Sequence, residues 1–245
     1  MASSAETRFH DPADLSPSEL ARLEDLDAPA LIDWAFSRYG LGVQVASSLA
    51  VEDVVLMHLA VKRAGPEVRV FTLDTGRLNQ ETYDMLDRVK ATLGVAPRVF
   101  FPDSQAVERY VNDHGANAFY DSVELRKACC AIRKVAPLAR ALADAPAWLT
   151  GLRRDQSVTR AALRKVEVDS SGRVKVAPLS DWTEEQVWAY CREHRLPANA
   201  LHAQGYPSIG CAPCTRAVAP GEHARAGRWW WEDASSKECG LHTKG

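Results

Sequence analysis

Two pairs of cysteines are the residues in this sequence whose types and spacing are best suited to chemistry. Cys129 and Cys130 are adjacent, and Cys211 and Cys214 have the Cys-x-x-Cys spacing that lets two thiolates reach one metal centre. Adjacent cysteines seldom bond to each other, because the small ring strains the peptide bond and the disulfide dihedral. The pairs therefore predict a four-thiolate centre holding zinc or an iron–sulfur cluster, in preference to cysteines buried as small apolar residues. Basic residues surround the first pair and strengthen this interpretation: Arg126, Lys127, Arg133 and Lys134.

The remaining two cysteines differ in their surroundings. Cys191 lies in an expected helix beside Val187 and Trp188, and we expect it to be a core residue. Cys239 stands six residues before the end of the sequence. Basic groups share this last stretch, and a nearby positive charge lowers the pKa of a thiol, so Cys239 is a candidate nucleophile. These groups are Arg225, Arg228 and His242.

Three polar turns carry the other candidate groups. They are Ser47-Ser48, Leu73-Asp74-Thr75-Gly76-Arg77 and Gly151-Leu152-Arg153-Arg154. Hydroxyl and backbone N–H groups ahead of a helix can hold a phosphate, glycine allows close approach of a ligand, and guanidinium groups bind phosphate or sulfate. Each turn also has an ordinary interpretation, namely a serine helix cap or a solvated arginine pair.

The elements expected around these turns alternate between strand and helix. Strands are expected at 42–46, 68–73, 98–101 and 148–150, and helices at 51–64, 80–93, 105–114, 123–134 and 137–143. This alternation predicts a parallel twisted sheet with helices on both faces. Ligands of such folds bind at the carboxyl ends of the strands, where all three polar turns lie.

Flanking segments complete the expected single α/β domain. Residues 1–40 are expected to be a helical segment, 41–219 the nucleotide- and cluster-binding domain, and 220–245 a mobile tail. A hairpin is expected at 165–168 and 173–176, and a capping box at Thr183 opens a helix that runs to about residue 194. We expect Trp229-Trp230-Trp231 to dock the tail.

Composition excludes several classes of protein. The chain has 245 residues, 46% of them hydrophobic and 25% charged, with a net charge of −2. This is ordinary globular composition without the basic field of a nucleic-acid binder. The N-terminus lacks the apolar region of a secretory signal, and no apolar run is long enough to span a membrane. Six cysteines in such a chain indicate metal or catalytic thiols in a reducing cytoplasm.

Together, these motifs resemble those of the assimilatory sulfonucleotide reductases, over about residues 42–242. The two cysteine pairs are similar to those of the branch that reduces adenosine 5′-phosphosulfate (APS) and carries a [4Fe-4S] cluster. The 3′-phosphorylated (PAPS) branch usually lacks both pairs. The resemblance implies the fold of the adenine nucleotide alpha hydrolases, whose Ser-Gly-Gly-x-Asp-Ser loop is here Ser47-Ser48-Leu49-Ala50-Val51-Glu52, without the glycines. The sequence ends soon after His242, so we expect no fused thioredoxin-like domain.

The resemblance also implies a mechanism. The Cys239 thiolate attacks the sulfur of APS and displaces AMP, and thioredoxin or glutaredoxin then releases sulfite from the enzyme thiosulfonate. The cluster would bind to Cys129, Cys130, Cys211 and Cys214 and position Lys134. The phosphosulfate would be held by Arg153, Arg154, Arg225 and Arg228. The other expected substrate-binding residues are Ser47 and Ser48, which can hold a phosphate, residues 73–77, which can contact the ribose or the base, and Gly151. His242 would help to keep Cys239 as a thiolate.

Two alternatives stay open at this point. One is a reductase that prefers or also accepts PAPS. The other is an iron–sulfur RNA-modifying enzyme or a zinc nucleic-acid-binding module on a related fold. The near-neutral charge and the missing glycines favour the reductase, so we expect a cytoplasmic enzyme that binds no nucleic acid and no membrane and that can form homo-oligomers.

Overall fold

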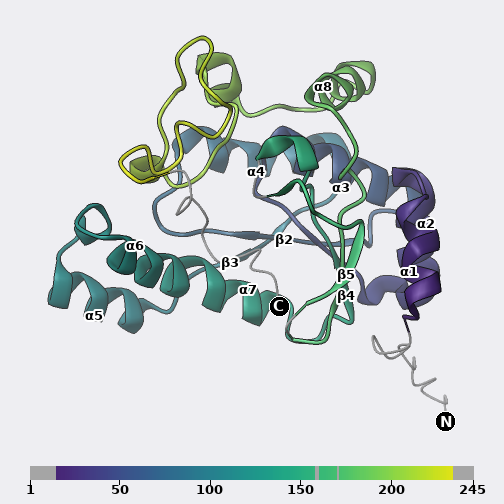
Figure 1. Ribbon diagram of the computed structural model, residues 1–245, viewed down its shortest axis with the longest axis horizontal. Coiled ribbons are helices and arrows are strands. Elements are labelled where there is room, and N and C mark those ends of the chain that lie inside the picture. The colour runs from purple at the N-terminus through teal and green to yellow at the C-terminus, as the bar shows by residue number, and fades with distance from the viewer. Residues whose placement is uncertain (1–14, 158–159, 170, 234–245) are drawn as a thin grey trace.

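The computed structural model describes residues 15–157, 160–169 and 171–233, which are coloured in Figure 1. Their centre is a six-stranded sheet in the order β3-β2-β1-β4-β6-β5. The strands are β1 (Gln44–Ala46), β2 (Arg69–Leu73), β3 (Arg98–Phe100), β4 (Ala147–Leu149), β5 (Val166–Val168) and β6 (Val174–Val176). All neighbours pair in parallel except β5 and β6, which form the expected antiparallel hairpin. The predicted parallel sheet is therefore confirmed.

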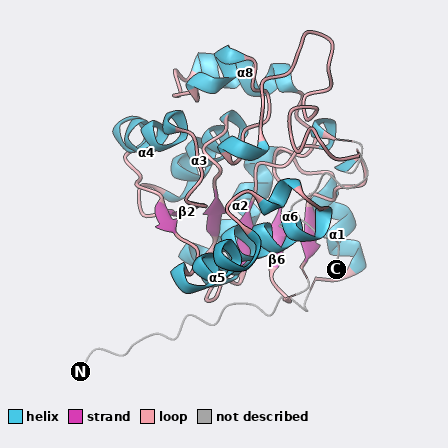
Figure 2. Cartoon of the chain, turned by 90° about the vertical axis from the view of Figure 1, so that its left-hand side faces the viewer, coloured by secondary structure: helices cyan, strands magenta, loops and turns pink. Residues whose placement is uncertain are grey.

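Helices cover both faces of this sheet. They are α1 (Pro17–Glu24), α2 (Ala28–Tyr39), α3 (Val51–Ala64), α4 (Gln80–Leu93), α5 (Ser104–His114), α6 (Val123–Cys130), α7 (Ala136–Ala141) and α8 (Glu184–Glu193). Figure 2 shows the strands, in magenta, with α3 and α4 above them. On the opposite face, Ala141 and Leu142 pack with Phe71 and Trp148 in a smaller core of their own.

The main core lies between the sheet and the helices α1 to α4 and α8. Val45, Val70 and Leu149 face one another across three neighbouring strands and are almost completely buried. Leu23 of α1 and Leu31 of α2 join the same core, so the N-terminal helices belong to this packing unit. Cys191 is also buried there, as expected.

Local signals at the helix ends agree with the expected boundaries. The Ser16 hydroxyl accepts a hydrogen bond from the Glu19 N–H at the start of α1. Thr183 and Gln186 form the expected capping box ahead of α8, each side chain accepting from the other residue's backbone N–H. These bonds satisfy N–H groups that have no partner inside the helix.

The interruption expected between residues 134 and 137 is absent, which corrects the prediction of two separate helices. A π-helical turn, Ala131–Val135, joins α6 to α7, and Val135 and Ala136 both keep helical dihedrals. Pro137 does not break the run, because it lies in the first turn of α7, where a proline needs no N–H partner. The run carries Cys129 and Cys130 together with the buried Arg133 and Lys134.

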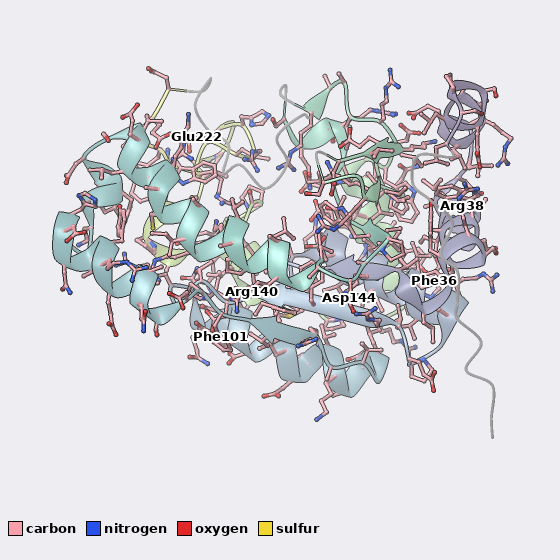
Figure 3. All side chains as sticks on the ribbon, turned by 90° about the horizontal axis from the view of Figure 1, so that it is seen from below. Phe36, Arg38, Phe101, Arg140, Asp144 and Glu222 are labelled. Atoms are coloured by element: carbon pink, nitrogen blue, oxygen red, sulfur yellow. The ribbon has the colours of Figure 1, made fainter. Side chains whose placement is uncertain are left out.

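Two polar contacts join the amino ends of β1 and β2 to the end of α7 and the segment that follows it. Asp144 pairs with Arg69 at 2.8 Å, and Gln44 Nε2 donates to the Ala141 carbonyl at 3.0 Å. Figure 3, seen from below, shows Arg140 beside Phe101, whose carbonyl accepts a hydrogen bond from the Arg140 guanidinium. No helix within the described ranges is long and apolar enough to cross a membrane.

Candidate active site

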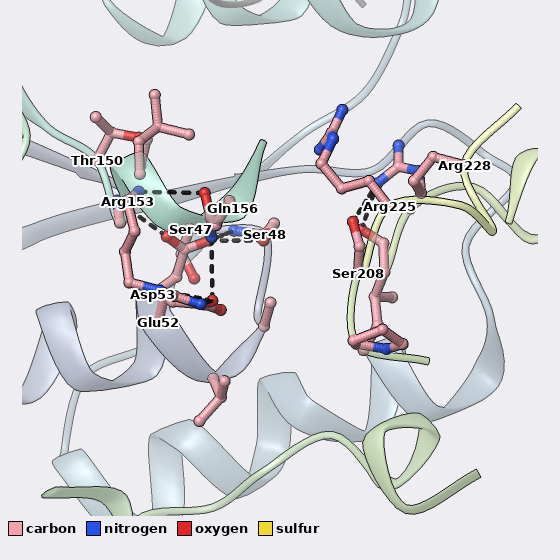
Figure 4. A pocket seen from close by; sticks show the side chains of 18 of the residues that line it. Ser47, Ser48, Glu52, Asp53, Thr150, Arg153, Gln156, Ser208, Arg225 and Arg228 are labelled. Atoms are coloured by element: carbon pink, nitrogen blue, oxygen red, sulfur yellow. Dashed lines mark hydrogen bonds and ion pairs between the residues drawn. The ribbon is translucent and has the colours of Figure 1, made fainter. Parts of the chain in front are cut away.

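A pocket of about 250 Å³ opens at the carboxyl ends of β1, β2 and β4. Its walls include Ser47 and Ser48 after β1, Leu73 and Thr75 at the end of β2, and Gly151 after β4. Figure 4 shows the loop between β1 and α3 on one side of the pocket and two arginines from the C-terminal part on the other. The pocket thus lies at the edge of the sheet where the sequence places its polar turns.

The Ser47-Ser48 turn is held by Asp53, a residue that the sequence analysis did not single out. Asp53 Oδ2 accepts hydrogen bonds from the Ser48 N–H and hydroxyl, both at 2.6 Å, and Oδ1 accepts from the Gly151 N–H at 3.2 Å. The carboxylate therefore ties the first turn to the end of β4. A Cβ at residue 151 would collide with this carboxylate, so this position requires glycine.

Leu49 takes a left-handed conformation, with φ at 63°. This region favours glycine, and a side chain there costs about 1–2 kcal/mol. The Ser-Gly-Gly-x-Asp-Ser loop named in the sequence analysis has glycine at this place, where this chain has leucine. Leu49 is 1% exposed, and burial of its side chain offsets the strain.

Burial raises the pKa of Asp53 from 3.8 to about 6, despite the hydrogen bonds from Ser48, which act in the opposite direction. The folded protein therefore holds this proton more tightly than the unfolded chain, and the free energy of unfolding should fall as pH rises through this interval. We expect the wild-type protein to lose about 3 kcal/mol relative to Asp53→Asn between about pH 4 and pH 7. Urea unfolding of both proteins across this range measures the difference, and a difference that does not change with pH would contradict it.

Arg153 lines the pocket, but its charge is already paired. It is 4% exposed, and its Nε and Nη2 donate to Glu52 Oε1 at 3.2 and 3.0 Å. The Gln156 side chain donates to the same oxygen at 3.0 Å. These bonds hold the loop after β4 against α3. The Glu52 carboxylate also reduces the net positive charge that Arg153 brings to the pocket.

Arg154, expected beside Arg153 as part of an anion clamp, lies outside the pocket. Its guanidinium pairs with Glu24 and Asp181, and its Nε donates to the Leu163 carbonyl at 2.8 Å. The short 3₁₀ turn Arg154–Gln156 begins after Arg153, so neighbouring side chains diverge. The structure therefore assigns Arg154 to the contact with α1 rather than to the pocket.

Basic residues from two other segments do reach the pocket. Lys134, Arg225 and Arg228 line it, as does Arg160, which the sequence analysis missed. Arg228 is 7% exposed, and its Nη1 donates to the Ile209 carbonyl at 3.0 Å, while its buried Nε has no hydrogen-bond partner among the described residues. A buried guanidinium with an unused donor is suited to an anionic ligand.

The turn after β2 lies between the pocket and the cysteines, and only some of its residues line the pocket. Leu73 and Thr75 face the pocket, whereas Asp74 accepts hydrogen bonds from the Gly76 N–H at 2.7 Å and the Tyr83 hydroxyl at 2.9 Å. Gly76 has φ at 69°, a conformation that favours glycine. Arg77 stacks on the Phe119 ring at 5.0 Å. Asp74, Gly76 and Arg77 therefore shape the turn and do not line the pocket.

All four cysteines of the predicted centre lie in one buried cluster. Cys129, Cys130, Cys211 and Cys214 are each 6–9% exposed and pack with Trp229 and Phe119. The Thr75 hydroxyl lies 3.2 Å from the Cys211 sulfur, and the Cys211 side chain also lines the pocket. The structure thus brings the two pairs together, next to the pocket, as the sequence predicts.

The electrostatic surroundings shift the pKa values of the cysteine thiols in different directions. Burial raises the pKa of the Cys129 and Cys214 thiols, that of Cys214 to about 12. Burial acts in the same direction on Cys211, but Lys134, the Thr75 hydroxyl and Arg228 outweigh it and lower the pKa of that thiol. A protein without metal therefore keeps the Cys129 and Cys214 thiols protonated, and a metal centre would have to displace those protons.

A buried ion pair adjoins the first cysteine pair. Arg126 is completely buried and donates to both carboxylate oxygens of Glu232, at 2.8 and 2.7 Å. Burial opposes its charge, yet the pKa of Arg126 is raised by Glu232 and by the Cys130 sulfur. The guanidinium also stacks on Trp229 at 4.7 Å.

Two expected site residues, Cys239 and His242, lie outside the described residues. The last described residue before them is Asp233. Of the expected tail anchors, Trp229 is 1% exposed, whereas Trp230 is 40% exposed. Docking is thus observed for Trp229.

Fold and site together define an α/β protein with a mostly parallel sheet and a buried cysteine cluster beside a pocket at the carboxyl ends of its strands. Residues 42–217 match the family model of the phosphoadenosine phosphosulfate reductase domain. The chain belongs to this family, which confirms the resemblance seen in the sequence.

Relatives and solved structures agree with this assignment. The chain is 56% identical over 229 residues to the adenosine 5′-phosphosulfate reductase of Burkholderia cepacia, covering 93% of this chain and 90% of that protein. It is 52% identical over 200 residues to the enzyme of the same name from Allochromatium vinosum, covering 81% and 78%. The phosphoadenylyl-sulfate reductase of Candida auris, solved with phosphate, has a TM-score of 0.69 at 27% identity and covers 83% of this chain and 98% of that one. The FMN adenylyltransferase of Candida glabrata, at 11% identity, a TM-score of 0.56 and coverage of 88% and 69%, shares the fold alone.

Proposed function

We propose that this protein reduces APS to sulfite and AMP, with electrons from a protein thiol such as that of thioredoxin or glutaredoxin. The observation that carries this proposal is the buried four-cysteine cluster in contact with a nucleotide-sized pocket through Thr75 and Cys211. Relatives that share about half of the sequence are named for this reaction. Sulfate assimilation is the process to which such a reaction belongs.

The pocket offers an apolar part and a cationic part for the two halves of APS. Phe71, Leu138 and Trp148 line the first, and are suited to the adenine ring. Lys134, Arg160, Arg225 and Arg228 line the second, and are suited to the phosphosulfate. The N–H groups of the first turn of α3, which follows the Ser47-Ser48 turn and lines the pocket, are suited to the α-phosphate, whereas the Ser48 N–H is already bonded to Asp53.

The chemical step then involves one bond exchange at sulfur. The Cys239 thiolate forms a bond to the sulfur of the sulfuryl group, and the bond from that sulfur to the phosphate oxygen breaks, so AMP leaves with the electron pair. A thiolate of the reductant next attacks the Cys239 sulfur, sulfite leaves with the electrons of the broken sulfur–sulfur bond, and a mixed disulfide forms. The second thiol of the reductant resolves this disulfide and restores Cys239 for the next cycle.

Lys134, Arg225 and Arg228 make the first attack feasible by reducing the repulsion between a thiolate and an anionic substrate. All of them lie on the cationic side of the pocket, and Lys134 also lowers the pKa of Cys211. We further propose that His242 helps to hold Cys239 as a thiolate.

The four cysteines fit a [4Fe-4S] cluster. They are buried, they lie together, and cationic side chains near them would balance the charge of a thiolate-bound cluster. Among the described residues, no group of three or more His, Cys, Asp or Glu is close enough to hold a single metal ion, and a cubane accepts more widely spaced sulfurs than one zinc ion does. Bound there, the cluster would supply an electrostatic field next to Lys134 while both electrons come from thiols.

Substrate choice tests the proposal directly. We expect kcat/KM for sulfite release to be higher with APS than with PAPS in the presence of thioredoxin, because the cysteine centre accompanies APS reductases in the resembling family. A higher kcat/KM with PAPS would assign the protein to PAPS, the substrate for which the Candida auris enzyme is named. Turnover of neither nucleotide would reject the reductase assignment.

The two arginines at positions 154 and 228 form a matched pair for testing the anion site. Arg228→Gln should lower the affinity for APS by about 10–100-fold, because a charged hydrogen bond contributes about 1.5–3 kcal/mol. Arg154→Gln should change the affinity little, since Arg154 pairs with Glu24 and Asp181 away from the pocket. Calorimetric titration of APS into Cys239→Ser protein measures binding without reaction. An equal loss in both variants would contradict this assignment.

A further inference from the structure

The segment from Gly227 to Glu232 contacts both cysteine pairs. Its backbone binds the second pair, because the Trp229 N–H donates to the Cys214 carbonyl at 3.1 Å and Thr215 forms a β-bridge with Arg228. Trp229 packs inside the cluster of the four cysteines. We name residues 227–232 the anchor segment.

Arg126 ties this segment to the first pair. It stands on α6, one helical turn before Cys130, and its side chain is completely buried. Both oxygens of Glu232, whose side chain is 2% exposed, accept from it in the fork geometry that fixes direction as well as distance. The Trp229 ring lies against the same guanidinium. Arg126 therefore sets the place of residue 232 relative to Cys130.

Residue 232 is also close in sequence to the nucleophile. Cys239 follows seven residues later, and seven residues span at most about 25 Å. The anchor segment itself contributes Arg228 and Trp229 to the pocket wall. The position of Glu232 thus limits where Cys239 can act, and a chain that left this place would lose the pocket wall as well.

We propose that Arg126 and Glu232 are positioning residues that hold the anchor segment, and through it the chain that leads to Cys239, against the cysteine centre. This inference rests on the proposed function in so far as Cys239 is the nucleophile. The Arg126–Glu232 ion pair acts in addition to the cysteines. The four thiolates would hold together the two segments that carry the cysteine pairs, and Arg126 joins the anchor segment to them as a third.

A shortened carboxylate tests position separately from charge. Glu232→Asp keeps the charge and removes one methylene, so a pair that fixes position should show a rate of thiosulfonate formation lowered by about 10–100-fold in a single turnover. The affinity for AMP should fall as well, because Arg228 and Trp229 of the anchor segment line the pocket, whereas the iron content should be unchanged, because all four cysteines remain. A pair that only neutralises charge would leave the rate of this variant at the wild-type value, and that result would overturn the proposal. Arg126→Lys, which keeps the charge and loses the fork, should slow the same step.

Proteolysis provides a readout that does not depend on activity. Release of the anchor segment should raise the rate of tryptic cleavage after Arg228 by about tenfold or more, since cleavage of a folded segment requires local opening. Mass spectrometry measures this cleavage rate. It should rise in Glu232→Asp and in Arg126→Lys, and it should not rise in Glu222→Gln. That control breaks the exposed pair between Arg216 and Glu222 in the same loop.

The two proposals fail in different ways. Wild-type protein that forms no adduct with APS would reject the proposed function, whereas the cleavage rates would still report on the anchor segment. Cleavage after Arg228 at equal rates in all proteins would reject the positioning role even if the enzyme is an APS reductase.

Discussion

Cys239→Ser protein should bind APS and retain its cysteine centre, yet form no covalent adduct and release no sulfite. Cys239 is not needed as a metal ligand, because four other cysteines gather in one buried cluster. A serine hydroxyl is far less acidic and less nucleophilic than a thiol, so turnover should fall by several orders of magnitude, as is usual when a covalent nucleophile is removed.

Intact-mass measurement after mixing with APS checks this result. Without a reductant, the wild-type protein should gain one SO₃ group on Cys239 and produce a single burst of AMP. Thioredoxin should then release sulfite. An adduct on another cysteine, or an adduct in Cys239→Ser protein, would assign the nucleophile elsewhere.

Cys211→Ser should abolish the cluster and the activity together. Wild-type protein purified without oxygen should be brown and contain about four iron and four acid-labile sulfide per chain. Of the four proposed ligands, Cys211 is the one that contacts Thr75 and lines the pocket, so a serine there should change the proposed metal centre and the proposed substrate site at once. Iron and sulfide analysis with the visible spectrum measures the loss.

Cys191→Ser is the matched control, because Cys191 is equally buried but lies on α8 and packs in the main core. It should keep the iron, the colour and the activity, with only a modest loss of stability from a buried hydroxyl. Stoichiometric zinc in a colourless wild-type protein would reject the cluster, and an unchanged cluster in Cys211→Ser would reject that ligand.

Much of the fold could be predicted because its strands and helices carry their own signals. The strand that ends at Leu73 and the helix Gln80–Leu93 are bounded by polar turns and glycine, and both were expected almost at their observed ends. The junction at Val135 and Ala136 could not be predicted in this way. A proline normally marks a break, and only the π-helical turn before it keeps the run continuous.

The site was harder to predict where function depends on contacts between distant residues. Asp53 lies in the first turn of a helix, where an acidic residue is ordinarily explained by the helix dipole. Its raised pKa arises from burial in the folded protein, and its hydrogen bond with the Gly151 N–H, at the end of another strand, forms only when the sheet is in place. Arg153 and Arg154 are neighbours in sequence, but the first reaches Glu52 and the second Glu24. Arg160 follows the same turn, and a third arginine so near to Arg153 and Arg154 could have indicated that it reaches the pocket.

The two cysteine pairs are separated by about 80 residues of chain, and these residues include β4 and the hairpin of β5 and β6. During synthesis, the first pair therefore emerges well before the second, and all six strands of the sheet precede the second pair in the chain. Loading of a metal cluster would then follow folding in time. A bond across such a loop restricts the unfolded chain as a disulfide does, by about 4–5 kcal/mol in the loop-entropy model. A cluster bound there would accordingly act as a cross-link that forms late, after the domain has folded.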